Sequence, residues 1–203
     1  LLAEQILGVK LAHATIGRAD RDSLQRTLAH STRRNCRCYS PAMKNTDIIV
    51  LGGGAAGLMC AITAGDRGRN VIVLEVSNRI GRKILMSGGG RCNFTNLHTD
   101  PAKFVSANRH FCKSALSRYT QGDFISLVEK HDIPYHEKTL GQLFCDNSSK
   151  DIVAMMQQEC TAAGVKILTD CGDIRVSKNG SFNVSCSHGQ FGCDALVVAT
   201  GGL

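Results

Sequence analysis

A short glycine-rich turn constrains the fold of this chain more than any other feature. Gly52-Gly53-Gly54-Ala55-Ala56-Gly57 matches the pattern GxGxxG and comes directly after the apolar run at residues 48–51. The Ala-rich segment from residue 55 to about 66 predicts a helix, and the apolar run at residues 71–74 predicts a second strand. Because parallel strands need a crossover between them, this stretch predicts a βαβ unit.

The three glycines of the pattern have separate physical roles. Gly52 permits the tight turn, Gly54 lets the backbone approach a pyrophosphate, and Gly57 lets the helix pack closely on the strand. The helix N-terminus supplies unpaired N–H groups and partial positive charge. A glycine-rich turn alone is also a common strand–helix junction, but here both strands and the helix accompany it. The unit therefore predicts a dinucleotide site.

An acidic residue closes the second strand of this unit. Glu75 lies 23 residues after Gly52, where a carboxylate can accept hydrogen bonds from both ribose hydroxyls. The same carboxylate repels a ribose 2′-phosphate, so NADP is disfavoured at this particular site.

A basic, glycine-rich block follows the unit. It contains Ser87-Gly88-Gly89-Gly90-Arg91-Cys92-Asn93, preceded by Arg82 and Lys83. Three consecutive glycines leave a bare backbone against which a flat ring can lie. The cations Arg82, Lys83 and Arg91 offer charge to phosphates or to a flavin edge that becomes anionic on reduction, and Ser87 and Asn93 can supply hydrogen bonds. The alternative is a flexible basic surface loop.

Four blocks together resemble the BaiN-like (YhiN-like) bacterial NAD(P)/FAD-dependent oxidoreductases, over roughly residues 44–203. They are the glycine turn with Glu75, the block from Arg79 to Asn96, Gly141-Gln142-Leu143-Phe144-Cys145, and Val197-Val198-Ala199-Thr200-Gly201-Gly202. The resemblance implies an α/β, Rossmann-like FAD-binding domain of the two-dinucleotide-fold type. It also implies FAD as cofactor, NAD(P)H as electron donor and a small-molecule substrate.

The same resemblance implies two further cofactor contacts. The Thr200-Gly201 turn would touch the cofactor, and a backbone group near Asp173 or Ile174 would meet the adenine. The catalytic residues, the substrate and the oligomeric state are not predicted. Relatives in this family continue beyond the final Ala-Thr-Gly-Gly turn, so we expect residues 43–203 to be an FAD-binding domain cut before its substrate domain.

Two other functions remain open at this point. One is a flavin-binding protein without turnover, such as a redox sensor or a partial copy of the enzyme. The other is a plain NAD-dependent dehydrogenase read out by Glu75, which leaves the block from Gly88 to Asn93 unexplained.

The positive charge of the chain is unevenly distributed. Residues 1–42 carry a net charge of +4, which leaves +3 of the total +7 for the other 161 residues. We expect residues 1–42 to be a basic leader, disordered or a non-native extension, with Met43 as a natural start. Because the charge belongs more to this leader than to a patch on the folded body, no nucleic-acid partner is expected.

The remaining composition indicates a cytoplasmic protein. No stretch approaches the about 18 apolar residues that a membrane span requires, and no signal-peptide pattern opens the chain. Ten cysteines without a CxxC pair indicate reduced thiols and no metal site. A redox pair of Cys92 and Cys145 near the flavin is a less favoured alternative to inert, buried thiols.

The rest of the chain predicts helices at residues 113–130 and 151–163 and a strand at 165–168. Residues 173–193 predict a small antiparallel β meander with a hairpin turn at Lys178-Asn179-Gly180. A final buried strand is expected at residues 195–199.

Overall fold

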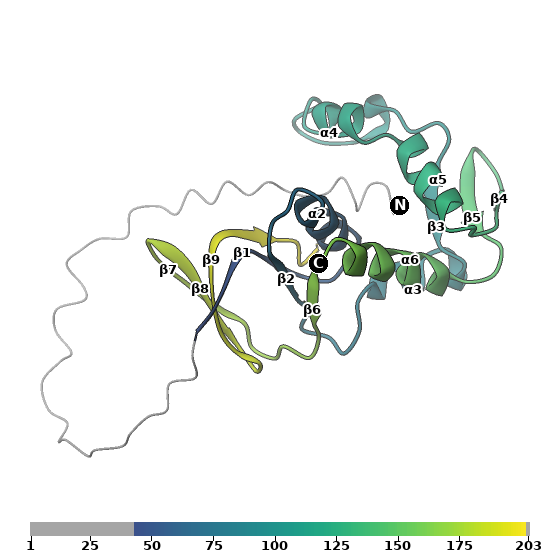
Figure 1. The fold of residues 1–203 in the computed structure, drawn as a ribbon. Helices are drawn as coiled ribbons and strands as arrows, with labels where there is room; N and C mark the ends of the chain where they lie inside the picture. The colour runs from purple at the N-terminus through teal and green to yellow at the C-terminus, as the bar shows by residue number, and fades with distance from the viewer. Residues whose placement is uncertain (1–42, 202–203) are drawn as a thin grey trace, which may run out of the picture.

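Four adjacent parallel strands form one side of a six-stranded sheet in the computed structural model, which describes residues 43–201 (Figure 1). The parallel strands are β1 (Lys44–Leu51), β2 (Val71–Leu74), β6 (Lys166–Leu168) and β9 (Gly189–Val198). The order across the sheet is β6-β2-β1-β9-β8-β7. The chain therefore places β2 and β9 on opposite sides of β1, which creates a topological switch point there.

The antiparallel meander continues from the same sheet. β7 (Arg175–Asn179) and β8 (Ser181–Cys186) form a hairpin around Gly180, whose φ is +77°. β8 then pairs antiparallel with the first half of β9. The predicted meander is confirmed, but β9 begins earlier than the expected strand at 195–199, because its first half pairs with both β8 and β1.

Helices α2 (Ala55–Gly65) and α6 (Ser149–Ala162) pack against each other beside the sheet. Alternating strand side chains separate the two faces of the sheet. Val50, Val71 and Val73 pack with Ala61 of α2. Their sequence neighbours form a second cluster, which includes Ile49, Leu51, Ile72, Leu74, Val184 and Phe191. The sheet is thus covered by helix on one face and by the meander's apolar side chains on the other.

A second, three-stranded antiparallel sheet was not predicted from the sequence. Its order is β3-β5-β4, formed by β3 (Asn93–Asn96), β5 (Gln142–Cys145) and β4 (Tyr135–Glu137). Helix α5 (Gln121–Lys130) packs on β3, and Phe94 contacts the rings of Phe124 and Tyr135. Strands of three or four residues are too short to show a period of two in the sequence.

The predicted helix at residues 113–130 is wrong in one respect, because it is two helices. α4 (Lys113–Arg118) ends at Tyr119, and α5 begins after Thr120. Thr120 and Asp123 form a capping box, in which each side chain accepts a hydrogen bond from the other residue's backbone N–H. This cap starts a new helix instead of continuing the old one. The helix predicted at 151–163 is confirmed as α6, which Ser148 caps.

Three short elements complete the described chain, namely α3 (Arg82–Met86), η1 (Ser87–Gly90) and η2 (Pro101–Lys103). No helix within residues 43–201 combines the length and the apolar character that crossing a membrane would need. The eight cysteines of this range are all free thiols. The predicted leader at residues 1–42 lies outside the described residues.

Candidate functional site

The carboxyl ends of four parallel strands meet at one edge of the sheet. Leu51 of β1 pairs with Leu74 of β2 and with Val198 of β9, and Leu74 pairs with Leu168 of β6. The residues that follow these ends therefore emerge side by side, including Gly52, Glu75 and Ala199. Ligands of open α/β sheets bind at this edge, next to the switch point.

Gly52 and Gly57 are required by close backbone contacts. Gly52 has φ +106°, and a Cβ atom there would lie 2.5 Å from the carbonyl oxygen of Ala199. A Cβ atom on Gly57 would overlap the carbonyl oxygen of Gly52. The predicted roles of these glycines in the tight turn and in helix–strand packing match this geometry.

The N-terminus of α2 is open. Gly54 is the N-cap residue, no side chain caps the helix, and a Cβ atom on Gly54 would meet nothing within 4 Å. The first α-helical hydrogen bond runs from Leu58 N to Gly54 O at 3.0 Å. The backbone N–H groups of Ala55, Ala56 and Gly57 precede it, so they are available to an anion beside this turn.

The Glu75 carboxylate lies beside the turn and is held by protein donors. Its Oε2 accepts from Gly53 N at 2.6 Å, and its Oε1 accepts from the backbone N and the Oγ of Ser77, at 2.8 and 2.6 Å. Burial alone would raise the pKa of Glu75. The hydrogen bonds from Ser77 and Gly53 and the charge of Arg82 outweigh it and hold the pKa below its ordinary value. Glu75 is therefore an ionised acceptor, and Oε2 keeps a free lone pair.

Ser77 is a residue that the sequence analysis missed. Its backbone N–H donates to Glu75. Its hydroxyl lies 2.6 Å from the Glu75 carboxylate and 2.8 Å from the Arg79 carbonyl, so these two acceptors share one hydroxyl hydrogen. A serine two residues after an acid at the end of a strand is the available signal, because Ser side chains commonly bond to nearby groups in turns.

The short helix α3 brings two predicted cations to this edge. Gly81, with φ +68°, precedes α3 and donates its N–H to Gly53 O at 2.8 Å. Arg82 is close enough to Glu75 to lower its pKa. The Nζ of Lys83 would lie 3.4 Å from a Cβ atom on Gly201, which has φ +85°. The turn after β1, the start of α3 and the Thr200-Gly201 turn after β9 are thus neighbours.

The predicted glycine block forms a left-handed loop after α3. Gly88, Gly89 and Gly90 have φ of +59°, +66° and +89°, values that only glycine adopts readily. A Cβ atom on Gly88 would lie 2.7 Å from Asn93 N, whereas the positions above Gly89 and Gly90 are open. This is the bare backbone surface that the sequence indicates.

The polar side chains of this loop divide between two roles. Ser87 Oγ is buried and makes no well-aligned hydrogen bond among the described residues, although the Cys92 thiol lies beside it. The Asn93 side-chain amide points into the second sheet, where its nitrogen, once the amide is turned to face these acceptors, donates to the carbonyls of Thr95 and Leu143 at 3.1 and 3.3 Å. Arg91 is exposed. Ser87 is therefore the side chain of the block that keeps hydrogen-bonding capacity for a ligand group.

Cys92 and Cys145 are adjacent and buried. Cys145 N donates to the carbonyls of Arg91 and Cys92, at 3.0 and 3.4 Å. Burial raises the pKa of Cys92 to about 11, although the Ser87 hydroxyl lowers it. Burial, together with the neighbouring Cys92, raises the pKa of Cys145 to about 12. Both thiols are protonated at neutral pH, which fits inert packing better than redox chemistry.

Asp173 lies in the loop between β6 and β7 and is exposed. Cys171 N, two residues earlier, donates to the Glu75 carbonyl at 3.1 Å. The loop that carries Asp173 thus begins beside the end of β2, on the side of Glu75 away from the glycine turn.

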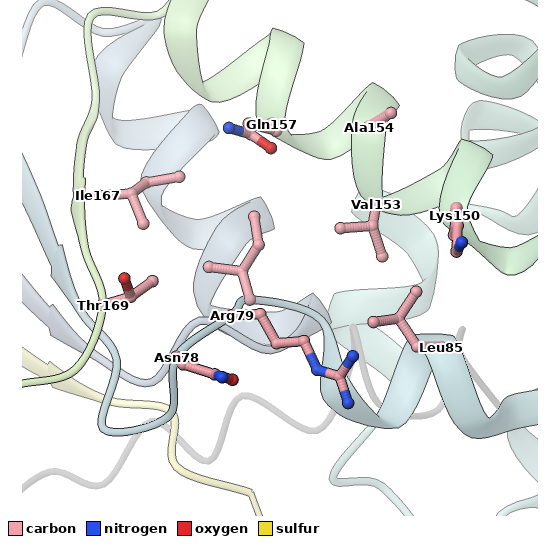
Figure 2. A pocket seen from close by; sticks show the side chains of 10 residues that line it. Asn78, Arg79, Leu85, Lys150, Val153, Ala154, Gln157, Ile167 and Thr169 are labelled. Atoms are coloured by element: carbon pink, nitrogen blue, oxygen red, sulfur yellow. The ribbon is translucent and has the colours of Figure 1, made fainter.

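A separate pocket of about 540 Å³ lies next to the loop after β2 (Figure 2). Its described lining comes from this loop, α3, α6 and β6 and includes Arg79, Lys150, Gln157, Ile167 and Thr169 but no acidic residue. None of the predicted cofactor residues lines it. The glycine turn, Glu75, Arg82, Lys83 and Gly201 gather instead at the carboxyl ends of the parallel strands.

The comparisons with known proteins agree with this geometry. Residues 46–203 match the family model described as "HI0933-like protein Rossmann domain". The chain is 51% identical over 162 residues to the "Ribosomal RNA dihydrouridine synthase" of Escherichia coli, and 50% identical over 160 residues to the protein of that name from Haemophilus influenzae. These matches cover 79% and 76% of this chain and 40% of each relative.

A more distant relative is the "3-dehydro-bile acid delta(4,6)-reductase" of Clostridium scindens, 28% identical over 159 residues. That match covers 75% of this chain and 38% of the relative. The chain therefore spans about two fifths of the length of the curated relatives it matches.

Proposed function

The chain belongs to the HI0933-like protein Rossmann domain family, and we propose that it is the FAD-binding part of a flavin-dependent oxidoreductase. One observation carries the proposal. The open N-terminus of α2 lies beside the ionised Glu75 carboxylate, so a site for a phosphate group and a site for ribose hydroxyls are adjacent.

The residues at the sheet edge fit the parts of FAD. The backbone N–H groups of Ala55, Ala56 and Gly57 bind the pyrophosphate, with Lys83 supplying positive charge from α3. Glu75 accepts from the ribose through the free lone pair of Oε2. The backbone near Asp173, beyond Glu75, meets the adenine.

The ring end of the cofactor is assigned to the other side of the turn. The isoalloxazine lies against Gly88, Gly89 and Gly90, where the backbone carries no side chain. The buried hydroxyl of Ser87, which makes no well-aligned hydrogen bond among the described residues, would gain an oxygen or nitrogen partner there. Arg82, Arg91 and the Thr200-Gly201 turn complete the set. Bound flavin supplies hydride or electron-pair transfer, and the chain orients it and provides the electrostatic environment.

The substrate that we propose for the whole protein is a uridine in ribosomal RNA. Two relatives that are about half identical to this chain are named for dihydrouridine synthesis in ribosomal RNA. Conversion of uridine to dihydrouridine adds a hydride and a proton across the C5–C6 double bond, so it needs a hydride donor together with an acid. We propose NAD(P)H as the source of electrons. This proposal departs from the expectation, based on net charge, that nucleic acid is not a partner.

Two measurements test the proposal. The first reconstitutes the chain with FAD, removes the free cofactor and records the flavin-to-protein ratio from the visible spectrum. The second compares the dihydrouridine content of ribosomal RNA in cells with and without the gene. Bound FAD and a loss of dihydrouridine without the gene are expected. Absence of flavin binding contradicts the cofactor assignment, and unchanged dihydrouridine contradicts the substrate.

The alternative is a flavin-binding protein that does not turn over. It predicts bound flavin together with ribosomal RNA whose dihydrouridine does not depend on the gene. The two measurements therefore separate it from the proposed enzyme.

A further inference from the structure

We propose that residues 97–118, called here the basic arm, form a surface that binds single-stranded ribosomal RNA. This inference rests on the proposed function, because it names where the RNA substrate contacts the chain. The basic arm includes η2 and α4 and lies between β3 and α5.

The basic arm carries a local excess of positive charge. The arm carries Lys103, Arg109, Lys113 and Arg118 against a single acid, Asp100. Its net charge of +3 equals the net charge of residues 43–203 as a whole. The remainder of that range is neutral overall, although residues 76–96, which include the proposed cofactor loop, hold four further cations and no acid. The arm is a basic stretch outside the proposed cofactor site, so a polyanion can bind it without competing with the cofactor.

The charges of the basic arm are not neutralised within the described chain. All four cations are exposed, and none of them is in the salt bridges between residues 43 and 201. The Asp100 carboxylate accepts from Ala102 N at 2.8 Å and so caps η2. Unpaired, exposed cations are the groups that release counterions from nucleic-acid phosphates.

Exposed apolar side chains accompany these cations. Phe111 is 50% exposed, and its ring contacts that of Phe104 edge-on at 6.4 Å. Val105, in the same arm, is fully exposed. A solvated charged face has no need of an exposed aromatic ring, whereas single-stranded RNA uses such a ring as a stacking platform beside its phosphate contacts. The pairing of cations with Phe111 therefore favours RNA.

The basic arm is a closed excursion whose two ends meet. Leu97 N donates to Gly141 O at 2.8 Å, and Gln121 Nε2 donates to Leu97 O at 3.2 Å. Cys112 and Leu116 are its buried anchors. Figure 1 shows α4 and its flanking loops at the periphery of the molecule, beyond α5. The arm can thus contact a large RNA without rearrangement of either sheet.

Its position in the chain links the basic arm to the proposed flavin loop. Strand β3 alone separates the arm from the block that ends at Asn93. A single strand of the second sheet therefore joins the arm proposed to bind RNA to the segment proposed to hold the flavin ring.

The test measures binding of a labelled single-stranded oligouridylate of about 15 nucleotides by fluorescence anisotropy over a range of salt concentrations. The arm variant replaces Lys103, Arg109 and Lys113 with Ala. The control variant replaces Arg67, Arg69 and Lys166 with Ala. These three exposed cations lie at the amino ends of β2 and β6, away from the carboxyl ends where the cofactor is proposed to bind. Both variants lose the same charge, and flavin content and circular dichroism report whether they fold.

The arm variant is expected to lose at least about tenfold in affinity at low salt. The slope of its log binding constant against log salt concentration should become less negative by about 2. The control variant should change little. Phe111→Ala should weaken binding by about tenfold without altering the salt dependence, and Phe111→Trp should retain affinity because a ring remains.

Equal losses in the arm and control variants overturn the proposal, and they leave the proposed function intact because the chain still binds RNA. A native chain that binds no oligouridylate also overturns it. In that case the flavin ratio and the dihydrouridine measurement decide separately whether the proposed function stands.

Discussion

Glu75 is the side chain on which the proposed cofactor site depends most. Three donors, from Gly53 and Ser77, converge on its carboxylate. Its place after a strand was predictable from the sequence, because the spacing from Gly52 defines it. The role of Ser77 was not predictable, since a serine hydroxyl can turn toward many partners in a loop.

Replacement of Glu75 by Gln should weaken FAD binding by at least about tenfold. The Gln amide has a single oxygen, so an NH2 group takes one of the two acceptor positions of the carboxylate. With that group in place of Oε2 the ribose hydroxyls lose their acceptor, at a cost of about 1–3 kcal/mol. The matched control is Glu137→Gln, an exposed glutamate at the end of β4. Dissociation constants from fluorescence titration provide the comparison, and equal values for the two variants would remove the ribose assignment.

The same carboxylate makes FAD binding dependent on pH. The folded pKa of Glu75 lies below its ordinary value of 4.5. The contribution of ionised Glu75 to the stability of the folded site is therefore complete above pH 4.5, and it is lost as the pH falls through the lower folded pKa. Flavin retention should drop in this acidic range for the native chain and much less for Glu75→Gln. A native chain and variant with parallel pH profiles would contradict this.

Gly54 and Gly57 allow stability and cofactor binding to be separated. In Gly57→Ala the new methyl group overlaps a backbone carbonyl in a tight turn, so we expect destabilisation of about 1–3 kcal/mol. In Gly54→Ala the methyl group enters open space, at φ −81° and ψ −179°, so the melting temperature should stay close to native while FAD affinity falls. Thermal unfolding and flavin titration of both variants test this contrast. If both variants kept the native FAD affinity, the pyrophosphate site would be contradicted.

At the scale of elements, the sequence predicts the units that repeat a clear period. The strand–helix–strand unit and α6 agree with the structure, because four consecutive apolar residues and long amphipathic helices leave strong patterns. The second sheet has strands of three to four residues, and its pairing joins segments some fifty residues apart, such as Asn93 and Phe144. No local pattern encodes such pairing. The break between α4 and α5 was also missed, although the Thr120–Asp123 cap was visible.

The cap at Thr120 should contribute measurably to stability. Thr120→Ala removes the side chain that accepts from Asp123 N, and loss of such a cap costs about 1 kcal/mol. Thr63→Ala is the control, because Thr63 lies within α2 and only bonds back to Met59 O. Chemical unfolding should show the loss for Thr120→Ala alone. Equal midpoints for the two variants would mean that the break between α4 and α5 does not depend on the cap.

At the scale of the whole molecule, two sheets share the work that the proposal assigns. The six-stranded sheet presents the glycine turn, Glu75 and Lys83 at one edge, and the second sheet supports the loop from Ser87 to Asn93. The sequence predicted the chemistry of this loop but not its support. A Cβ atom on Gly88 would lie 2.8 Å from the Phe144 ring, a contact that depends on the three-dimensional pairing of β3 with β5.

The buried free thiols of this fold are probes of local opening. Six of the eight described cysteines are buried: Cys145 and Cys193 in the two sheets, Cys160 in α6, and Cys92, Cys112 and Cys171 in segments between elements. A thiol reagent or an oxidant reaches such a group only during the brief intervals when the surrounding structure opens. The rate at which each thiol reacts therefore reports how often its region opens. The N–H of Cys171 donates to the Glu75 carbonyl, so the reaction rate of Cys171 reports how often the proposed cofactor edge opens. The reaction rate of Cys145 reports opening of the second sheet.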